Sequence, residues 1–261
     1  MSQFNNILLK KEDKVATVTI NRPDKMNAMN SPTRKELVSA FTDAANDKEI
    51  RAVILTGAGD RAFSAGQDLS ESQTFSVDQA SPWIKEFGQV YDAIIDMPKP
   101  IIARLNGVTV GAGLQIALLC DMRIASENAK VAMTEINVGI PCITGSFLLY
   151  HIAGYFQAAE LTLTGSVVDA KRAAELGVIN RVVPTGELDS TISDLTDNLK
   201  EKPPGAMALQ KEWLRWFKRD LVEVSKNAEE IHTKAFDSGE PAEMMKKFLE
   251  KRGLTKTQKK L

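Results

Sequence analysis

The sequence predicts a layered α/β fold in which short buried strands alternate with helices, followed by a helical region. Compact apolar runs occupy residues 52–55 and 101–103, and a segment of helical spacing lies between them. A glycine-containing turn follows each of these runs. Strand, helix and strand in alternation are typical of layered α/β cores. A chain of 261 residues can bury a sizeable core without a disulfide or a metal.

The amino-terminal part is predicted to form two strands and then a helix. Residues 7–10 and 16–20 have the pattern of short strands, and the polar turn 11–14 separates them. Ser31, followed by Pro32, is predicted to cap a helix. A serine hydroxyl can accept a hydrogen bond from the first helical turn, and the missing N–H of proline is harmless there.

The middle of the chain continues the alternation. Apolar residues at helical spacing over 83–95 predict a helix that ends before Pro98. The run at 101–103 predicts a buried strand. A glycine turn at 111–113 then leads into an apolar helix over 114–119.

The character of the chain changes near residue 187, where charged helical patterns replace the alternation. We therefore predict two regions, an α/β core over residues 1–184 and a helical region over residues 185–261.

Charge and cysteine usage exclude several classes of protein. Lys and Arg total 33 against 34 Asp and Glu, so a net charge of −1 offers no overall attraction for nucleic acid or an anionic membrane. No apolar run approaches the roughly 20 residues of a spanning helix, and the amino terminus lacks a secretory signal pattern. The two cysteines fit a reducing compartment, which predicts a cytoplasmic protein. Two histidines and two cysteines, widely spaced, predict no zinc site.

Two motifs are weak when they are taken alone. Residues 57–62 resemble a dinucleotide-binding fingerprint, but the sequence that follows does not open a helix, so a simple turn is favoured. Residues 62–66 resemble a nucleophile elbow with Ala62 in place of its first glycine. A serine hydrolase also needs a base, and only His151 and His232 could supply one.

Two glycine-rich stretches are more informative as a pair. Residues 64–69 and 106–115 each follow a predicted buried strand, and the second stretch opens an apolar helix. N–H groups at a helix start have no internal acceptor, so two facing turns could donate to one oxygen and form an oxyanion hole. Plain turn chemistry remains the alternative.

Four fragments together are more specific than any single motif. They are INRPDKMNAMN, AVILTGAGDRAFSAGQDLSE, KPIIARLNGVTVGAGLQIALLCDMRIASENAK and AAELGVINRVVP. In this order they resemble the enoyl-CoA hydratase/isomerase (crotonase) superfamily, and the resemblance runs from about residue 6 to the FLEKR near the carboxyl end. It implies a spiral of ββα units with a carboxyl-terminal helical region that forms trimers or dimers of trimers. It also implies an acyl-CoA substrate, with CoA as part of the substrate and no separate cofactor.

The resemblance also implies roles for individual residues. The backbone amides of Gln67 and Ala112 would hold the thioester oxygen, and Glu135 would be the catalytic acid/base. A carboxyl group in an apolar pocket has a raised pKa, which suits proton transfer; a surface carboxylate is the alternative for Glu135. The residues expected to contact CoA or the acyl group are Lys25, Met26, Ala28, Ala65, Gln67, Asp68, Leu69, Gly111 and Lys251.

Gln115 departs from the pattern of the family's hydratases. Those enzymes have two glutamates, and the first of the two positions is Gln115 in this chain. An amide forms hydrogen bonds but takes up no proton near neutral pH. We therefore expect a single-acid reaction through Glu135, such as double-bond isomerisation of an enoyl-CoA. Hydration, and a catalytically weak acyl-CoA-binding protein, remain alternatives.

The loop at residues 139–146 departs as well. The family usually has a Pro-Gly-x-Gly-Gly run there, whereas this chain has Cys142 and Ile143. These larger side chains are expected to narrow the acyl pocket, and Cys142 is interpreted as a packing thiol.

Overall fold

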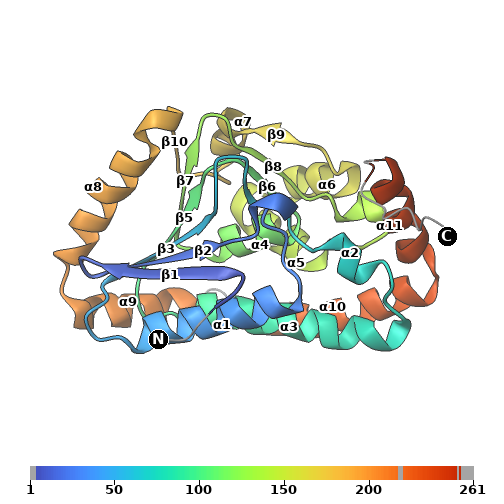
Figure 1. Cartoon of the computed structure of the whole chain (residues 1–261), viewed down its shortest axis with the longest axis horizontal. Coiled ribbons are helices and arrows are strands. Elements are labelled where there is room, and N and C mark those ends of the chain that lie inside the picture. Colours follow the sequence, from blue (N-terminus) through green and yellow to red (C-terminus); the bar gives the residue numbers. More distant parts are fainter. Residues whose placement is uncertain (1–3, 217–219, 252, 254–261) are drawn as a thin grey trace, which may run out of the picture.

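The computed structural model describes residues 4–216, 220–251 and 253, and within these ranges the strands form two sheets (Figure 1). The larger sheet has the order β1 (Ile7–Glu12), β2 (Val15–Ile20), β3 (Ala52–Gly57), β5 (Ile101–Leu105), β7 (Met122–Ser126) and β10 (Arg181–Val183). The smaller sheet has the order β4 (Ala62–Ser64), β6 (Val108–Val110), β8 (Lys130–Ala132) and β9 (Val168–Asp169). Only β1 and β9 run antiparallel to their neighbours in these sheets.

The two sheets are built by a chain that alternates between them. In each of the pairs β3–β4, β5–β6 and β7–β8, the first strand joins the larger sheet and the second joins the smaller one. A helical segment follows each pair. The predicted spiral of ββα units is therefore confirmed.

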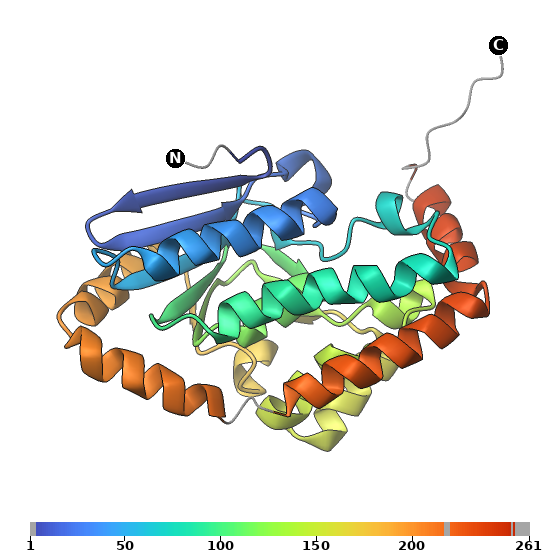
Figure 2. The same ribbon diagram turned by 90° about the horizontal axis from the view of Figure 1, so that it is seen from below.

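Three long helices lie side by side, and the first of them packs against β1 and β2. They are α1 (Ser31–Asn46), α3 (Val77–Ile95) and α10 (Leu221–Asp237), and α3 packs between the other two (Figure 2). The short helix α4 (Ala112–Leu119) is apolar on all sides, and residues 113–119 are buried. A helix of this kind can only exist inside a core. It packs against α3 and α5.

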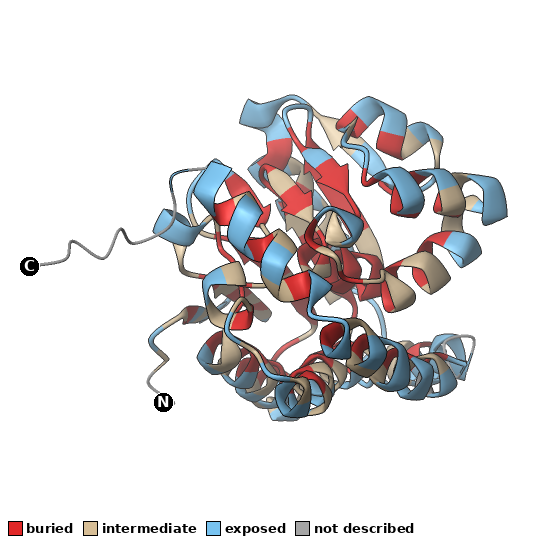
Figure 3. Ribbon diagram, turned by 90° about the vertical axis from the view of Figure 1, so that its right-hand side faces the viewer, coloured by how far each residue is buried: buried red, intermediate tan, exposed pale blue. Residues whose placement is uncertain are grey.

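The remaining helices cover the rest of the molecule. They are α2 (Leu69–Ser72), α5 (Ile143–Ala153), α6 (Tyr155–Thr164), α7 (Ala170–Glu175), α8 (Leu188–Lys200), α9 (Pro204–Trp216) and α11 (Glu240–Lys251), with the 3₁₀ turns η1 (Pro23–Lys25), η2 (Glu135–Val138) and η3 (Thr185–Glu187). Buried residues gather on the strands and the inward helix faces, and exposed residues lie outside (Figure 3). Among the described residues, no helix is long and apolar enough to cross a membrane.

Three predicted helix starts were wrong. Asn30, not Ser31, caps α1, because its Oδ1 accepts a hydrogen bond from the Thr33 backbone N–H at 3.2 Å. Helix α3 begins at Val77 and contains Pro82, with the Gln79 side chain accepting from the Ser76 backbone N–H at 2.9 Å. Helix α4 begins two residues earlier than expected, inside the glycine turn. In each case a polar residue or a glycine belongs to the first helical turn, where apolar periodicity gives no signal.

Candidate active site

Three neighbouring parallel strands bring the predicted catalytic groups to one edge of the smaller sheet. Strand β6 pairs with β4 on one side and with β8 on the other. Gln67 follows β4, Ala112 follows β6 and Glu135 follows β8. Because the carboxyl ends of parallel strands lie at the same edge of a sheet, these three residues lie near one another although Gln67 and Glu135 are 68 positions apart in the sequence.

The two glycine-rich turns are packed backbone against backbone. A Cβ atom at Gly66 would lie 2.8 Å from the Val110 carbonyl oxygen and 3.0 Å from the Ala112 nitrogen. A Cβ atom at Gly113 would lie 2.5 Å from the Ser64 carbonyl oxygen. Gly66 also has a φ of +83°, which disfavours other residues. The close approach of the two turns therefore depends on glycine at both positions.

The amides of Gln67 and Ala112 are free to donate. The Met29 N–H donates to the Gly66 carbonyl at 2.7 Å, and the Asp68 N–H donates to the Met29 carbonyl at 3.1 Å. Since successive N–H groups of an extended chain alternate in direction, the Gln67 N–H points away from Met29. Ala112 opens α4, so its N–H has no acceptor within the helix. In the described part of the chain, neither amide donates a hydrogen bond. Two such donors on adjacent turns suit a developing oxyanion.

Glu135 presents one bonded and one unbonded carboxyl oxygen. Its Oε1 accepts a hydrogen bond from Nε2 of Gln115 at 2.6 Å, and its buried Oε2 has no well-formed hydrogen bond to any described residue. Burial raises the pKa of Glu135, while hydrogen bonds from its own backbone, Gln115 and the Cys142 thiol offset part of the rise. Glu135 is therefore not a surface carboxylate, and its pKa is displaced in the direction that general acid/base chemistry needs.

Cys142 is a half-buried neighbour of that carboxyl group. Burial raises the pKa of the Cys142 thiol well above its usual value, and the charge of Glu135 raises it further. A thiol that stays protonated is a poor nucleophile. The thiol therefore lines the site, in agreement with a packing role.

Tyr91 fixes the orientation of Gln115. The Tyr91 hydroxyl donates to Oε1 of Gln115 at 2.6 Å, and burial raises the pKa of Tyr91, which keeps the hydroxyl protonated. A carboxylate only accepts hydrogen bonds, so the NH₂ group of the amide faces Glu135 and its carbonyl faces Tyr91. Gln115 thus connects Tyr91 to Glu135 without offering a second proton-transfer group.

The segments expected to bind CoA lie side by side. The Ala65 N–H donates to the Met26 carbonyl at 2.9 Å, which places residues 25–28 against the turn that follows β4. Met26 and Asn27 adopt left-handed φ angles of 52° and 55°. The buried Asn27 amide supports this turn by donating to the Ala58 and Ala62 carbonyls at 3.0 and 2.8 Å. A pocket of about 200 Å³ lies beside Met26, between this turn and residues 58–62.

The other residues expected to contact CoA differ in exposure and in the hydrogen bonds that they already make within the protein. Asp68 caps α2 through the Ser70 N–H at 3.1 Å and pairs with Arg22 at 2.9 Å. Burial acts to raise the pKa of Asp68, but the hydrogen bonds from Ser70 and Arg22 outweigh it and lower the pKa. The Asp68 side chain therefore has a structural use within the protein. Ala28 and Gly111 are buried, Leu69 is half-buried and Lys25 is exposed.

Lys251 is exposed in the last turn of α11. Helix α11 packs against α2 and η2, and the Ser72 hydroxyl contacts the Met245 sulfur at 3.4 Å. The helix that carries Lys251 therefore lies against α2, which begins two residues after Gln67, and against η2, which begins at Glu135.

Sequence reasoning missed two buried polar residues at the site, Arg34 and Tyr91. Tyr91 lies within the apolar pattern of residues 83–95, which gives no sign of its hydroxyl, although a buried tyrosine hydroxyl needs a partner. Arg34 shares a helix face with Leu37 and Phe41 and is 1% exposed. An arginine on an apolar face was the available signal, because such a group is rarely buried unpaired.

The fold and these turns define an enzyme of the crotonase class, and comparisons with known proteins agree. The family model Enoyl-CoA hydratase/isomerase matches residues 10–259. The chain belongs to the enoyl-CoA hydratase/isomerase family.

Individual relatives match over most of their length. A short-chain-enoyl-CoA hydratase of Clostridium acetobutylicum is 35% identical over 96% of this chain and 97% of that protein. A crotonyl-CoA hydratase of Syntrophomonas wolfei is 37% identical over 80% of each chain. The crystal structure of an enoyl-CoA hydratase from Mycobacterium avium subsp. paratuberculosis superposes with a TM-score of 0.87 at 26% identity, covering 94% of this chain and 100% of that one.

Proposed function

We propose that this enzyme moves the double bond of a 3-enoyl-CoA to C2, with Glu135 as its single acid/base. The observation that carries the proposal is the hydrogen bond from Gln115 to Glu135, which puts an amide where a second carboxyl group would be needed for efficient hydration. Isomerisation needs only one group that takes a proton and returns it.

The proposed reaction has two proton transfers. Glu135 removes a proton from C2, and the electron pair left behind delocalises through C3–C4 and onto the thioester oxygen. The amides of Gln67 and Ala112 stabilise that oxygen, each by about 3–4 kcal/mol in comparable oxyanion holes. The protonated Glu135 then returns the proton at C4, and the double bond lies between C2 and C3. A raised pKa suits both transfers, because the same group must accept and release a proton.

Hydration of a 2-enoyl-CoA is the second candidate, because the similar proteins named above are hydratases. In that reaction Glu135 would both activate water and protonate C2, and Gln115 would only orient the water. We expect this route to be slower here than isomerisation.

The substrate is proposed to carry CoA along residues 25–28 and 65–69, with Gly111 beside the thioester and Lys251 near a CoA phosphate. We further propose that residues 185–261 help a homotrimer or a dimer of trimers to form around the core of residues 1–184, and that the enzyme is cytoplasmic. Size-exclusion chromatography with light scattering tests the assembly.

Straight-chain 2-enoyl- and 3-enoyl-CoA thioesters of several lengths test the reaction, with conversion followed by ultraviolet absorbance. We expect the wild type to form 2-enoyl-CoA from 3-enoyl-CoA faster than it hydrates 2-enoyl-CoA. Glu135→Gln should lower kcat by about 10²–10⁴, the usual contribution of a general acid/base, with acyl-CoA binding within a few-fold. Hydration that exceeds isomerisation would overturn the proposal. Binding without turnover of either substrate would favour an acyl-CoA-binding protein.

A further inference from the structure

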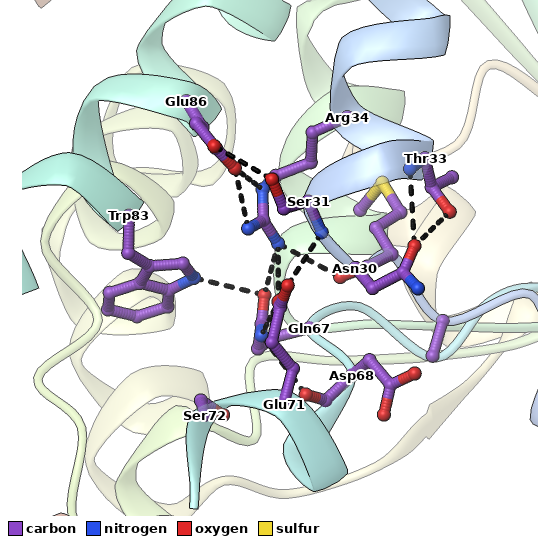
Figure 4. A network of polar contacts seen from close by, with 12 residues as sticks. Asn30, Ser31, Thr33, Arg34, Gln67, Asp68, Glu71, Ser72, Trp83 and Glu86 are labelled. Carbon is purple, nitrogen blue, oxygen red and sulfur yellow. Dashed lines mark hydrogen bonds and ion pairs between the residues drawn. The ribbon is translucent and has the colours of Figure 1, made fainter. Parts of the chain in front are cut away.

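Arg34 is a fully buried arginine that joins three segments of the chain. It lies in the first turns of α1, and its side chain is 2% exposed. Its Nε and Nη2 donate to Oε2 of Glu86 on α3 at 2.9 and 2.7 Å. Its Nη1 lies 2.9 Å from Oε1 of Gln67 and 3.1 Å from Oε2 of Glu71 on α2 (Figure 4). The guanidinium is therefore a bridge between α1, α3 and the turn that follows β4.

The Gln67 side chain has every hydrogen-bonding position occupied. Its Oε1 accepts from Arg34 and from Nε1 of Trp83 at 3.0 Å. Its Nε2 donates to the Asp68 carbonyl at 3.0 Å and to Glu71 at 2.9 Å. A primary amide has two acceptor and two donor positions, so this side chain is held in one orientation (Figure 4).

We infer that Arg34 is a positioning residue for the oxyanion hole: by holding the Gln67 side chain, it fixes the direction of the Gln67 backbone N–H. The inference rests on the proposed function, in which that N–H contacts the thioester oxygen. Oxyanion donors act strongly only when they are held in place before the reaction, since a loose donor must be reorganised during it.

The charged groups around Arg34 agree with a role in holding neighbouring side chains in place. A buried ion pair is often no more stabilising than apolar residues of the same volume. The guanidinium, however, has several donors in a rigid fork, so it can hold Glu86, Glu71 and Gln67 in fixed relative positions. A leucine at position 34 would fill the core, but Oε1 of Gln67 would then accept a hydrogen bond only from Nε1 of Trp83 among these two donors.

The test measures kcat, KM and enolate formation. The probe is acetoacetyl-CoA, a 3-ketoacyl thioester with an acidic C2 proton, whose bound enolate is followed by ultraviolet absorbance. Enolate on the wild-type enzyme shows that its oxyanion hole works; its absence overturns the proposed function and this inference with it. If the wild-type enzyme forms the enolate, differences between it and the Arg34 variants report on Arg34 alone.

Arg34→Met should lower kcat and the bound enolate fraction about 10- to 100-fold, below the full loss of an oxyanion donor, while KM for the CoA ester stays within about threefold. Arg123→Met is the matched control. Arg123 is also buried and donates to the Val178 and Cys120 carbonyls at 2.7 and 2.9 Å, away from the site. Its loss should lower the melting temperature but leave the enolate fraction unchanged.

A double variant separates positioning from a general loss of stability. Gln67→Met removes the side-chain amide and keeps the backbone N–H. If Arg34 acts through that amide, adding Arg34→Met to Gln67→Met should change kcat by less than about twofold. Additive effects in the double variant would overturn the inference, as would a folded Arg34→Met enzyme with wild-type enolate and kcat.

Trp83→Phe decides the case if Arg34→Met does not fold. It keeps an aromatic ring among Phe87 and Phe236 and removes one of the two donors to the Gln67 carbonyl. We expect kcat and the enolate fraction to fall about three- to tenfold, with KM unchanged, because the orientation of Gln67 is only partly released. Wild-type values of both in Trp83→Phe would then overturn the inference.

Discussion

The Gln115 amide donates a hydrogen bond from Nε2 to Oε1 of Glu135 across 2.6 Å. The other carboxyl oxygen, Oε2, remains buried and without a well-formed hydrogen bond in the described part of the chain. One oxygen of Glu135 is thus held by Gln115, and the second is the one that the proposed reaction requires to take up and return a proton. Because glutamine cannot exchange a proton near neutral pH, Glu135 is the member of this pair that can act as an acid or a base.

The decrease of kcat/KM toward acidic pH, which is the acidic limb of the pH profile, should report the protonation of Glu135. Burial raises the pKa of Glu135, and the carboxylate form is the base in the proposed isomerisation. We therefore expect kcat/KM to fall as the pH drops through a value above that of an ordinary glutamate. Initial rates across the acidic range measure it, with enzyme stability checked at each pH. A limb at or below the ordinary value would contradict the displaced pKa.

Tyr91→Phe should move this limb to higher pH. Without the hydroxyl, the Gln115 carbonyl loses its donor, and the amide can turn that carbonyl toward Glu135. A carbonyl that faces the carboxyl group accepts a hydrogen bond from the protonated acid and so favours that form. The midpoint of the acidic decrease in kcat/KM should therefore move up by roughly one pH unit, or about 1.4 kcal/mol, which is less than the free energy of a hydrogen bond to a charged group. The phenylalanine ring keeps the packing on Phe87. An unchanged limb would show that Tyr91 does not set the orientation of Gln115.

Gln115→Glu should increase hydration of a short 2-enoyl-CoA by at least about tenfold, or roughly 1.4 kcal/mol of barrier. The new carboxyl group would lie within hydrogen-bonding distance of Glu135, so the pair should hold one proton between them at neutral pH. One acid and one base is the arrangement that water addition needs. Gln115→Met, which removes the amide and adds no acid, is the control and should gain no hydration. A wild type that already hydrates at a typical enzyme rate, with no gain in Gln115→Glu, would refute the single-acid interpretation.

Lys251→Ala should raise KM for CoA esters about two- to tenfold at low ionic strength and less at high salt, because an exposed charge is screened. The lysine lies on a helix that packs against α2 and η2. Lys246→Ala on the same helix, where the side chain is directed to another face, is the control. Equal KM values for wild type and Lys251→Ala at low salt would place this lysine outside the CoA site.

Asp68→Asn should lower the free energy of unfolding by about 1–2 kcal/mol at neutral pH through loss of the ion pair with Arg22. The folded pKa of Asp68 lies below its usual value, so its stabilising effect is present above the unfolded pKa and disappears as the pH falls through the folded pKa. Denaturant unfolding at neutral and acidic pH should therefore show the difference shrinking toward acid. Asp24→Asn, at an exposed position on η1, is the control. A difference that is the same at every pH would show that the charge of Asp68 is not its source.

Local patterns predicted much of the fold. The strand at 101–103 and the alternation that produces the ββα spiral are short-range features, because apolar periodicity and turn residues act over a few positions. The predicted turn at 11–14 was too long, because β1 continues to Glu12 and the turn occupies residues 13–14. The helix starts failed at Asn30 and Val77, where a polar side chain supplies a hydrogen bond that hydrophobicity does not reveal.

Some features of the candidate site could likewise be predicted from the sequence, and others could not. By itself, the sequence determined the family, the two glycine turns, the position of Glu135 and the absence of a second glutamate at Gln115, because these are matters of residue type in order along the chain. Only the tertiary structure decided that Tyr91 orients Gln115, that Oε2 of Glu135 is buried, and that Arg34 reaches Gln67, which lies 33 positions further along the chain. Hydrogen-bond partners and burial are set by which segments meet in space. The pKa of Glu135 and the fixed direction of the Gln67 amide therefore become visible only once the strands and helices are packed together.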